Sequence, residues 1–442
     1  MKIGAFISSI KSLKDNKGFM RYFNNTSWLF LEKILKTINI LIVGMFLARY
    51  LGPEQYGILS YSLAYVLLFS ALAKLGLDAI VVKALVKHET ERDNILGTSF
   101  ILKLVGAILS ILILLGISNT VHQIQEKELI FIFSFSIFFL AFSVIDFYFQ
   151  SKVLSRFSVY ASMFSLVVSI LVKLTLIFYR ASLSAFVYAL LLEIIILSIA
   201  YLFFYFRNGF SLSNWRFNKT WAFTLLKDSF PLLLGSIFIV VYMKIDQIMI
   251  KSMLDAAEVG KYSVAVTLSE GWYFLPMIIL SSIFPAILNA KESNRDLYYD
   301  RLKNLYRLMF YLALIIAVPI TFLSDWIIAI FYGIDYLDAA QILKIHIWAG
   351  IFVFLGVAST RWLIVENLQI FSTINTGLGA LLNIILNYIL IPKYGIVGAA
   401  WATLITYFFS GFFVYSLFRK TRINFFLISK SIFIISRDDK TY

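Results

Sequence analysis

The sequence contains no cysteine and few charged residues. Only 14% of its 442 residues are charged, whereas 60% are hydrophobic and the mean hydropathy is +0.85. The missing cysteines exclude disulfide bonds and thiol chemistry, although they do not indicate a compartment. The low charge and high hydropathy exclude a water-soluble globular protein, because no such surface could remain hydrated. The sequence therefore predicts an integral membrane protein.

Motifs for nucleotide and metal chemistry are also missing. No GxxxxGK[ST] phosphate loop is present, because pairs such as Lys36-Thr37 follow no glycine-rich run, and this excludes an ATPase site. His88-Glu89 begins like a zinc-binding helix, but Arg92 occupies the place of the second histidine. We therefore expect no metal site and no cofactor. The net charge of +14 lies mostly in loops and tails on one side, which indicates membrane topology rather than nucleic-acid binding.

Apolar runs of about 20 residues, the length of one membrane span, follow one another from end to end. The predicted spans are residues 27–48, 57–83, 95–117, 128–150, 157–179, 183–206, 229–250, 258–288, 305–323, 340–364, 368–391 and 397–418. With the N-terminus in the cytoplasm, this count places twenty-three loop and tail Lys and Arg residues on the cytoplasmic side and six opposite. We therefore predict an all-α polytopic membrane protein with about twelve spans and both termini in the cytoplasm.

The spans fall into two six-helix lobes. The predicted segments are an interfacial amphipathic N-terminus (1–26), an N-lobe (27–206), a cytoplasmic amphipathic linker expected to lie on the surface as a helix (207–228), a C-lobe (229–418) and a basic cytoplasmic tail (419–442). A shift of 203 residues superimposes Leu51, Gly57 and Ser60 on Leu254, Gly260 and Ser263. Matching loops suggest parallel repeats, as in transporters that rock two lobes about a central site.

Charged residues inside the spans are the first functional candidates, because each is costly in lipid unless it faces water or a partner. The basic residues there are Lys33, Lys36, Lys74, Lys83, Lys103, Lys173, Lys244, Arg307, Lys344 and Arg361. Lys83, Arg307 and Lys344 lie near span ends, where their side chains can extend to the membrane surface. Lys74 and Asp78 are one helical turn apart and could simply neutralise each other.

The remaining cations predict an electropositive cavity that concentrates an anion. Lys33 and Lys36 project from one side of the first span, near Glu32 and Asn39. Arg361 can hold an oxyanion through both edges of its planar guanidinium group. We expect Lys33, Lys36, Lys74, Lys103 and Arg361 to bind the substrate.

Two carboxylates, Asp246 and Glu270, are candidates for coupling transport to H⁺ or Na⁺. A structural pair between Lys244 and Asp246 is the alternative. Asn375, Asn383 and Asn387 favour interhelical hydrogen bonds over ligand binding, since amides commonly join packed helices in lipid.

Four short motifs give the chain a family resemblance. They are Leu51-Gly-Pro-Glu-Gln-Tyr-Gly57, Asp246-Gln-Ile-Met-Ile250, Glu258-Val-Gly-Lys-Tyr-Ser263 and Tyr394-Gly-Ile-Val-Gly-Ala-Ala400. In this order, over residues 25–420, they resemble the Wzx or O-antigen type of polysaccharide flippase. These flippases belong to the multidrug/oligosaccharidyl-lipid/polysaccharide (MOP) exporter superfamily.

The resemblance implies two six-helix lobes around a central, often cationic cavity that works by alternating access, as in the MATE-like fold. It implies a bacterial inner-membrane protein that moves a polyprenyl-pyrophosphate-linked oligosaccharide, such as an O-antigen repeat unit for lipopolysaccharide, from the cytoplasmic to the periplasmic leaflet. Membrane lipids, a polymerase and a chain-length regulator are the partners it suggests. Only Lys33, Lys36 and Asp246 lie in or beside the matching motifs.

Two other functions remain open. A cation-coupled drug antiporter of the same superfamily would present an acidic or aromatic cavity, whereas basic residues outnumber acidic ones within these spans. A membrane glycosyltransferase or polymerase would need catalytic acids and bases on a sizeable outer loop. The largest predicted outer loop, Ser324–Asp338, has three aspartates but no lysine or arginine. We therefore expect a transporter and not an enzyme.

Overall fold

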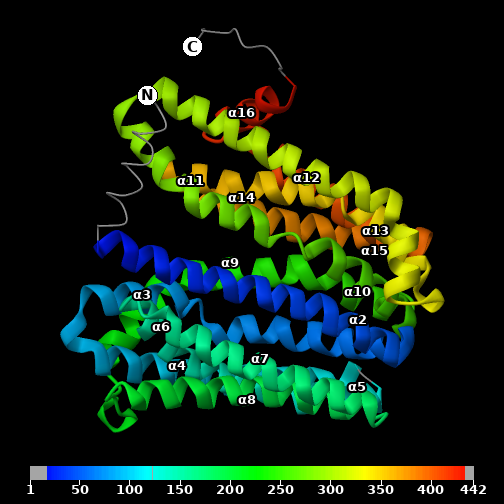
Figure 1. Ribbon diagram of the computed structural model, residues 1–442, viewed down its shortest axis with the longest axis horizontal. Coiled ribbons are helices and arrows are strands. Elements are labelled where there is room, and N and C mark those ends of the chain that lie inside the picture. The colour runs from blue at the N-terminus through cyan, green and yellow to red at the C-terminus, as the bar shows by residue number, and fades with distance from the viewer. Residues whose placement is uncertain (1–16, 122, 434–442) are drawn as a thin grey trace. The chain divides into compact units, whose positions relative to one another are not determined.

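The computed structural model describes residues 17–121 and 123–433, which form helices and contain no strand. The α-helices, labelled in Figure 1, are α2 (Lys17–Lys74), α3 (Leu77–Lys87), α4 (Arg92–Val121), α5 (Ile124–Phe139), α6 (Val144–Ser151), α7 (Ser155–Phe178), α8 (Leu183–Arg207), α9 (Lys219–Met253), α10 (Ala256–Glu270), α11 (Phe274–Ser293), α12 (Arg295–Phe331), α13 (Asp338–His346), α14 (Ala349–Val365), α15 (Ile370–Gly411) and α16 (Arg422–Phe433). Short 3-10 turns are η1 (Glu89–Glu91), η2 (Leu140–Ser143), η3 (Leu212–Asn214), η4 (Ile334–Tyr336) and η5 (Phe413–Ser416). The predicted all-α class is confirmed.

Ten segments of the described chain are long and apolar enough to cross a membrane. Two of these, Ser27–Lys87 with 61 residues and Ile370–Ser416 with 47, are long enough for two crossings each. Gly52 interrupts the first with φ 73°, and Gly395 interrupts the second with φ 59°. Both values lie in the left-handed region that favours glycine, and a break there lets the chain turn back. Counting each interrupted segment as two crossings gives the twelve predicted spans.

Contacts within the chain divide it into two compact units. The N-terminal unit comprises residues 17–43 and 65–236 of the described chain, and the C-terminal unit comprises residues 44–64 and 237–433. The predicted lobes follow the chain order strictly. The contacts instead group the turn between the first two spans with the C-terminal unit, and the start of α9 with the N-terminal unit.

The repeated loop motif meets its copy inside the C-terminal unit. A Cβ atom on Gly57 would lie 1.7 Å from the backbone oxygen of Ala256, and a Cβ atom on Gly260 would lie 2.0 Å from that of Pro53. Only hydrogen atoms fit at these two positions, so the backbones of α2 and α10 touch where the 203-residue shift superimposes the two glycines. The repeat read from three identities therefore marks a close contact between helices.

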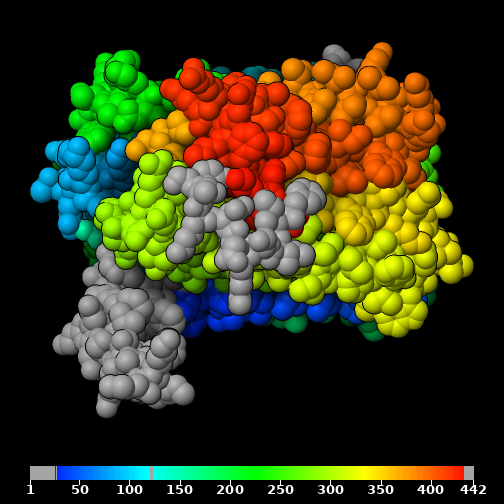
Figure 2. Space-filling view, turned by 90° about the horizontal axis from the view of Figure 1, so that it is seen from above, coloured from blue at the N-terminus to red at the C-terminus, as the bar shows by residue number. Residues whose placement is uncertain are grey.

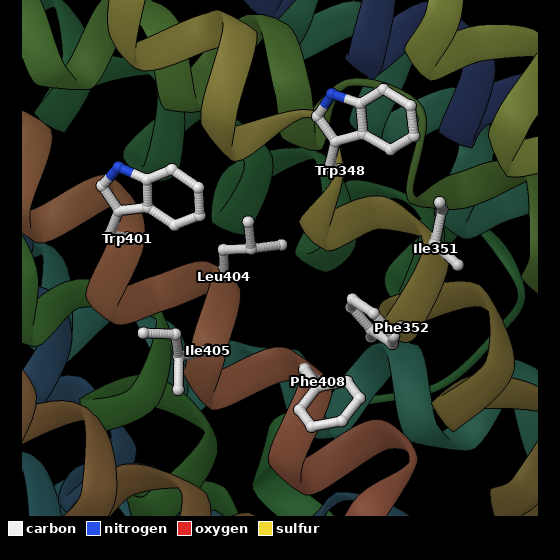
Figure 3. Close-up of a pocket in the computed structure, with 7 residues that line it drawn as sticks. All are labelled: Trp348, Ile351, Phe352, Trp401, Leu404, Ile405 and Phe408. Carbon is white, nitrogen blue, oxygen red and sulfur yellow. The ribbon is translucent and has the colours of Figure 1, made fainter.

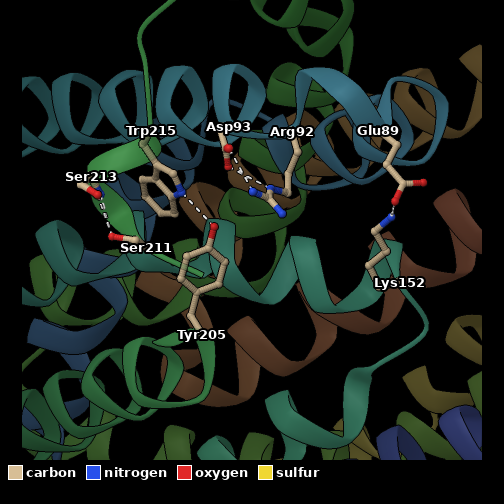
Figure 4. A network of polar contacts seen from close by, with 8 residues as sticks. All are labelled: Glu89, Arg92, Asp93, Lys152, Tyr205, Ser211, Ser213 and Trp215. Carbon is tan, nitrogen blue, oxygen red and sulfur yellow. Dashed lines mark hydrogen bonds and ion pairs between the residues drawn. The ribbon is translucent and has the colours of Figure 1, made fainter. Parts of the chain in front are cut away.

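The core of the N-terminal unit forms where α3, α4, α6 and α8 converge. Leu77, Val81, Phe149 and Tyr205 are fully buried there, and Trp215 from the linker packs against them. The Trp215 indole also donates a hydrogen bond to the Tyr205 hydroxyl at 3.0 Å, as Figure 4 shows. The linker is thus anchored by a side chain that fills the core.

The linker is not a single surface helix, and that expectation was wrong. Its first part contains only η3, and its second part is the beginning of α9. The Arg216 N–H donates to the backbone oxygen of Asp93 at 3.3 Å, and the Asn218 N–H donates to the Thr98 hydroxyl at 2.9 Å. These bonds hold the backbone extended across the start of α4, so that its polar groups are satisfied without a helix.

Ion pairs also stabilise the part of the N-terminal unit that lies near the linker. Glu89 pairs with Lys152, joining η1 to the end of α6 (Figure 4). Arg92 pairs with the adjacent Asp93 and lies 4.7 Å from the centre of the Phe210 ring. Glu89 and Asp93 are therefore neutralised by nearby bases, and Glu91 instead accepts hydrogen bonds from Asn94 and Trp221.

Two polar segments of the C-terminal half are more ordered than the sequence suggested. The predicted outer loop Ser324–Asp338 is shorter, because α12 continues to Phe331 with Ser324 and Ile328 buried. The predicted tail 419–442 contains α16, which packs on α12 and buries Asn424, Leu427 and Ile428. In Figure 2 the red C-terminal segment lies against the yellow-green of that region. The predicted interfacial N-terminus, residues 1–26, falls largely outside the described residues.

The close contact at Gly57 makes a stability prediction. Replacing Gly57 by Ala should lower the thermal unfolding temperature in detergent, because the new methyl group forces the two backbones apart, at a cost of about 1–3 kcal/mol. Gly44→Ala in the same helix is the matched control, since nothing lies within 4 Å of its Cβ position. Equal unfolding temperatures for the two variants would show that the glycine contact does not stabilise the fold.

Candidate functional site

The predicted cations of the N-terminal unit differ in whether they have partners. On α2, Lys36 forms an ion pair with Glu32 at 2.7 Å and keeps 43% of its side chain exposed. Lys33 is exposed and forms no ion pair or hydrogen bond with any described residue. Residues three apart share a side of a helix, so the two ammonium groups lie on neighbouring parts of α2. One cation is thus free and the other is only partly neutralised.

Lys103 is fully enclosed by partners. Only 2% of its side chain is exposed, and its Nζ donates to Ser143 at 2.7 Å and to Asp78 at 3.2 Å. The ammonium group also lies 4.5 Å from the centre of the Phe147 ring. Asp78 therefore pairs with Lys103 and not with Lys74, which has no ion pair among the described contacts. To bind a substrate directly, Lys103 would have to leave three partners, and its direct role stays a prediction.

A second buried pair links α7 to α8. Lys173 donates to Glu193 at 2.9 Å, and Ser169 donates to the same carboxylate. Lys173 is 6% exposed, so this pair neutralises charge inside the unit rather than presenting it to an anion.

In the C-terminal unit, Arg361 remains available. It lies on α14, is partly exposed, and its guanidinium carbon is 5.3 Å from the centre of the Phe284 ring. It forms no ion pair with any carboxylate in the described chain. Contact with a ring face leaves the donors at the edge of the guanidinium group free, and these are the donors that bind phosphate bidentately.

Asp246 is the centre of a buried polar cluster that joins three helices. Its carboxylate accepts hydrogen bonds from the Tyr262 hydroxyl at 2.7 Å, the Thr403 hydroxyl at 2.7 Å and the Asn387 amide at 2.5 Å. The Asn387 amide also donates to the Asn383 oxygen at 3.0 Å. Asp246 is only 4% exposed. We call these five residues, Asp246, Tyr262, Asn383, Asn387 and Thr403, the Asp246 cluster.

The helices explain why these residues meet. Asn383 and Asn387 are four residues apart on α15, so their amides lie on one side of that helix. Thr403 follows the break at Gly395, which returns the second half of α15 beside the first. No basic residue of the described segments forms an ion pair with Asp246, so the alternative pair with Lys244 is not formed. Amides bridge helices as predicted, but they do so around a carboxylate.

The Asp246 cluster offers only oxygen atoms and amide groups. Among the described residues there is no group of three His, Asp or Glu side chains that could hold a metal ion. A carboxylate with hydroxyl and amide oxygens is instead suited to a hard cation such as Na⁺, or to a proton. The Asn387 Oδ1 and Asn383 Nδ2 atoms are buried without a partner in the described chain, so an amide could rotate and turn an oxygen toward a bound cation.

Glu270 lies at the end of α10, close enough to interact electrostatically with both Lys244 and Asp246. It forms no ion pair or hydrogen bond with the described residues through its carboxylate. It is therefore a neighbour of the Asp246 cluster and not a member of it.

An apolar groove lies on the surface of the C-terminal unit. It has a volume of about 390 Å³ and is lined, as Figure 3 shows, by Trp348, Ile351, Phe352, Trp401, Leu404, Ile405 and Phe408. These residues come from α14, the turn before it and the second half of α15, and several of them are exposed. Because both helices lie in predicted spans, hydrocarbon chains of the membrane are the natural surroundings of this groove.

Comparison with known proteins places this fold among transporters. The structure aligns with an inward-facing MATE-family multidrug resistance transporter of the MOP superfamily at a TM-score of 0.75 and 14% identity, over 89% of this chain and 95% of that one. It aligns with the lipid II flippase MurJ in an inward closed conformation at a TM-score of 0.68 and 19% identity, over 92% and 90%. A MOP-superfamily transporter from Pyrococcus furiosus matches at 0.60 and 14%, over 93% and 94%. The chain thus has the fold of MOP-superfamily transporters.

Comparison with sequence families identifies the family of the chain more closely than the fold does. The family described as "Polysaccharide biosynthesis protein" matches residues 22–291, and the MatE family matches residues 231–389. The chain therefore belongs to the polysaccharide biosynthesis protein family, as its motifs predicted. Comparison with curated proteins gives no match.

Lys103 is buried and paired whereas Lys33 is exposed and unpaired, so we expect their substitutions to affect stability differently. Lys103→Met should lower the thermal unfolding temperature, because it leaves Asp78 and Ser143 without their donor, at a cost of about 1–3 kcal/mol. Lys33→Met, the control, should leave that temperature unchanged because this side chain is exposed and unpaired. If both variants unfold like the parent protein, the buried pair does not support the N-terminal unit.

Proposed function

We propose that the protein is a flippase that moves a polyprenyl-pyrophosphate-linked oligosaccharide from the cytoplasmic to the periplasmic leaflet of a bacterial inner membrane. The observation that carries this proposal is a set of cations, Lys33, Lys74, Lys244 and Arg361, that lie in membrane spans without an ion-pair partner in the described chain. Unpaired cations are costly in a membrane, so they are kept where a polar ligand or water meets them.

A diphosphate is a suitable ligand for these cations, because it is negatively charged and its oxygens can accept hydrogen bonds from lysine and arginine side chains. In the C-terminal unit, Arg361 can present two parallel N–H donors to a phosphate. In the N-terminal unit, Lys33, Lys36 and Lys74 supply point charges that can replace the water an anion loses. Lys103 acts in this proposal through Asp78, whose half-exposed carboxylate it holds in place. The lipid tail stays in the bilayer beside the protein, where apolar surfaces such as the groove between α14 and α15 can contact it.

The direction of transport follows from the charge of the substrate. An inside-negative membrane potential is worth about 2.3 kcal/mol per charge per 100 mV, and it favours outward movement of an anion. Hydrolysis of ATP is therefore not required for the outward step. Lobes with excess positive charge would return against the same potential, and a coupled cation can adjust that balance.

We assign cation coupling to the Asp246 cluster, with Glu270 as the neighbouring carboxylate. Its buried oxygens support binding of Na⁺ or of a proton, because either one neutralises a carboxylate that has no basic partner. A polymerase and a chain-length regulator that accept the exported repeat units remain partners in this proposal.

A drug antiporter fits the same fold less well. Three carboxylates of the described spans are already paired with lysines, since Glu32 pairs with Lys36, Glu193 with Lys173 and Asp78 with Lys103. The unpaired lysines and the unpaired arginine would repel an organic cation. The balance of free charge favours an anionic substrate.

The substrate assignment predicts the behaviour of a double variant. Lys33→Ala combined with Lys36→Ala should abolish surface-polysaccharide formation in a strain that lacks its own copy, and lipid-linked sugar should accumulate on the cytoplasmic leaflet. The double arginine variant is the matched control and should retain function, because it keeps both charges at the same positions. Full polysaccharide production by the alanine variant at equal protein level would remove these lysines from the substrate site.

The coupling assignment predicts a specific loss. Na⁺ or a lower pH should raise the unfolding temperature of the parent protein, because a bound cation stabilises the folded state by RT ln(1 + [L]/Kd). Asp246→Asn should remove this response, whereas Asp335→Asn, in the outer turn η4, should preserve it. KCl of equal ionic strength controls for screening. An unchanged response in Asp246→Asn would place the cation elsewhere.

A further inference from the structure

The 203-residue shift also superimposes the linker on the C-terminal tail. It places Lys219, where α9 begins, on Arg422, where α16 begins. Residues of like type coincide across this stretch: Trp215 with Phe418, Arg216 with Arg419, Phe223 with Phe426, Leu225 with Ile428 and Lys227 with Lys430. The shift is defined by loops elsewhere in the chain, so this agreement is independent evidence for the repeat. In the C-terminal unit, α16 is therefore the copy of the beginning of α9.

The two copies pack alike, each within its own unit. Leu225 is 1% exposed in the core of the N-terminal unit, and Ile428 is 0% exposed in the core of the C-terminal unit. Trp215 and Phe418, which precede the two helices, are partly buried against the same cores. Each helix thus buries one side and leaves the opposite side uncovered.

The uncovered side of each helix carries a base, a phenylalanine and a second base, spaced by four residues. Residues at this spacing follow one side of a helix, here for about 12 Å at 1.5 Å per residue. They are Lys219, Phe223 and Lys227, which we call the α9 stripe, and Arg422, Phe426 and Lys430, which we call the α16 stripe. The Phe223 side chain is 72% exposed and the Phe426 side chain is 52% exposed.

Both stripes lie in strongly basic segments. Residues 207–228 contain four bases and one acid, and residues 417–433 contain four bases and no acid. Lys219, Lys227 and Arg422 are exposed and form no ion pair with any described residue. Each stripe therefore presents positive charge beside an exposed aromatic ring.

Both stripes also lie at the level where membrane spans begin. The Asn218 N–H, one residue before α9, donates at 2.9 Å to the hydroxyl of Thr98, in the first turn of the predicted span 95–117. Asn424 on α16 accepts a hydrogen bond from the hydroxyl of Tyr306, in the first turn of the predicted span 305–323. The polar head groups of a bilayer lie at the ends of its spans. Six predicted spans separate the stripes, so both belong to the same side of the membrane.

We propose that the α9 and α16 stripes bind anionic phospholipids at the membrane surface, one stripe for each unit. The phenylalanine inserts at the boundary between head groups and acyl chains, while the flanking bases pair with lipid phosphates. A bilayer suits these stripes better than a soluble acidic partner does, because an exposed ring gains from contact with hydrocarbon and both stripes lie at the ends of spans. Each unit is thereby attached to the same leaflet through its own lipid contacts.

The absence of cysteine from the sequence allows a label to be placed beside each stripe. Thr220→Cys and Ile423→Cys, which the 203-residue shift also superimposes, replace exposed residues and carry a fluorophore on the full chain in liposomes. Phosphatidylglycerol and phosphatidylcholine, each with the same nitroxide at the top of one acyl chain, are compared as short-range quenchers. We expect phosphatidylglycerol to be enriched about fivefold or more near each label, since one base near an anionic surface is worth a factor of about five.

Charge removal tests each stripe against the other. Lys219→Gln combined with Lys227→Gln should abolish the preference for phosphatidylglycerol at position 220 and leave it unchanged at position 423. Arg422→Gln combined with Lys430→Gln should do the reverse. Unchanged quenching at the second position shows that each variant is folded.

Arg180→Gln combined with Lys393→Gln is the matched control, because it removes two exposed bases from the opposite predicted side of the membrane. It should preserve the preference at both positions, and an equal loss there would overturn the proposal, because net charge would then explain the effect. Weak quenching by both lipids would overturn it in favour of a soluble acidic partner. Equal quenching by the two lipids, or a preference at only one position, would also overturn it. No lipid-linked substrate is involved, so a negative result leaves the proposed flippase activity standing.

Discussion

Hydrocarbon offers no hydrogen bonds, so each charge and amide inside the spans of this chain needs a protein partner or contact with water. The chain meets this constraint in two ways. Lys103 is buried and paired with Asp78 and Ser143, and Lys173 is buried and paired with Glu193, which makes both lysines part of the structure. Lys33 and Arg361 have no carboxylate partner in the described chain, which leaves their charge for a ligand. Whether a charged side chain has a partner in the protein, more than its charge alone, distinguishes structural residues from candidate binding residues.

Much of the fold could be predicted from the sequence because its causes are local. Apolar runs of span length and glycines at the turns decide where the helices begin and end, and Gly52 and Gly395 act within a few residues. The structures of the linker and the tail were harder to predict from the sequence. Arg216 and Asn218 are held extended by hydrogen bonds to residues more than a hundred positions away. The sequence of this polar, aromatic segment favours a helix, because the distant partners that hold its backbone extended cannot be identified from the sequence.

The candidate site could be predicted by residue type but not by pairing. Asp246 was identifiable because a carboxylate in an apolar run is rare. Its donors Tyr262 and Thr403 were not, since both are common in spans and lie on other helices. The Asp78 partner of Lys103 is 25 positions away, whereas Lys74 at helical spacing was the local choice. The three asparagines of α15 looked alike, yet two lie around Asp246 and Asn375 lies beside the Tyr415 hydroxyl. The spacing of residues along a helix predicts which side chains are neighbours on that helix, but it does not predict their partners on other helices.

The proposed anion site and the proposed cation site make opposite demands on the same membrane protein. A lysine already paired with a carboxylate gains little from a phosphate, so the anion site needs free cations. The Asp246 cluster needs a carboxylate that no cation has neutralised. Lys244 and Asp246 are two residues apart on α9, and side chains at that spacing project to nearly opposite sides of a helix. A short sequence can therefore carry both charges without forming a pair, and helix periodicity keeps the two proposed binding functions chemically separate.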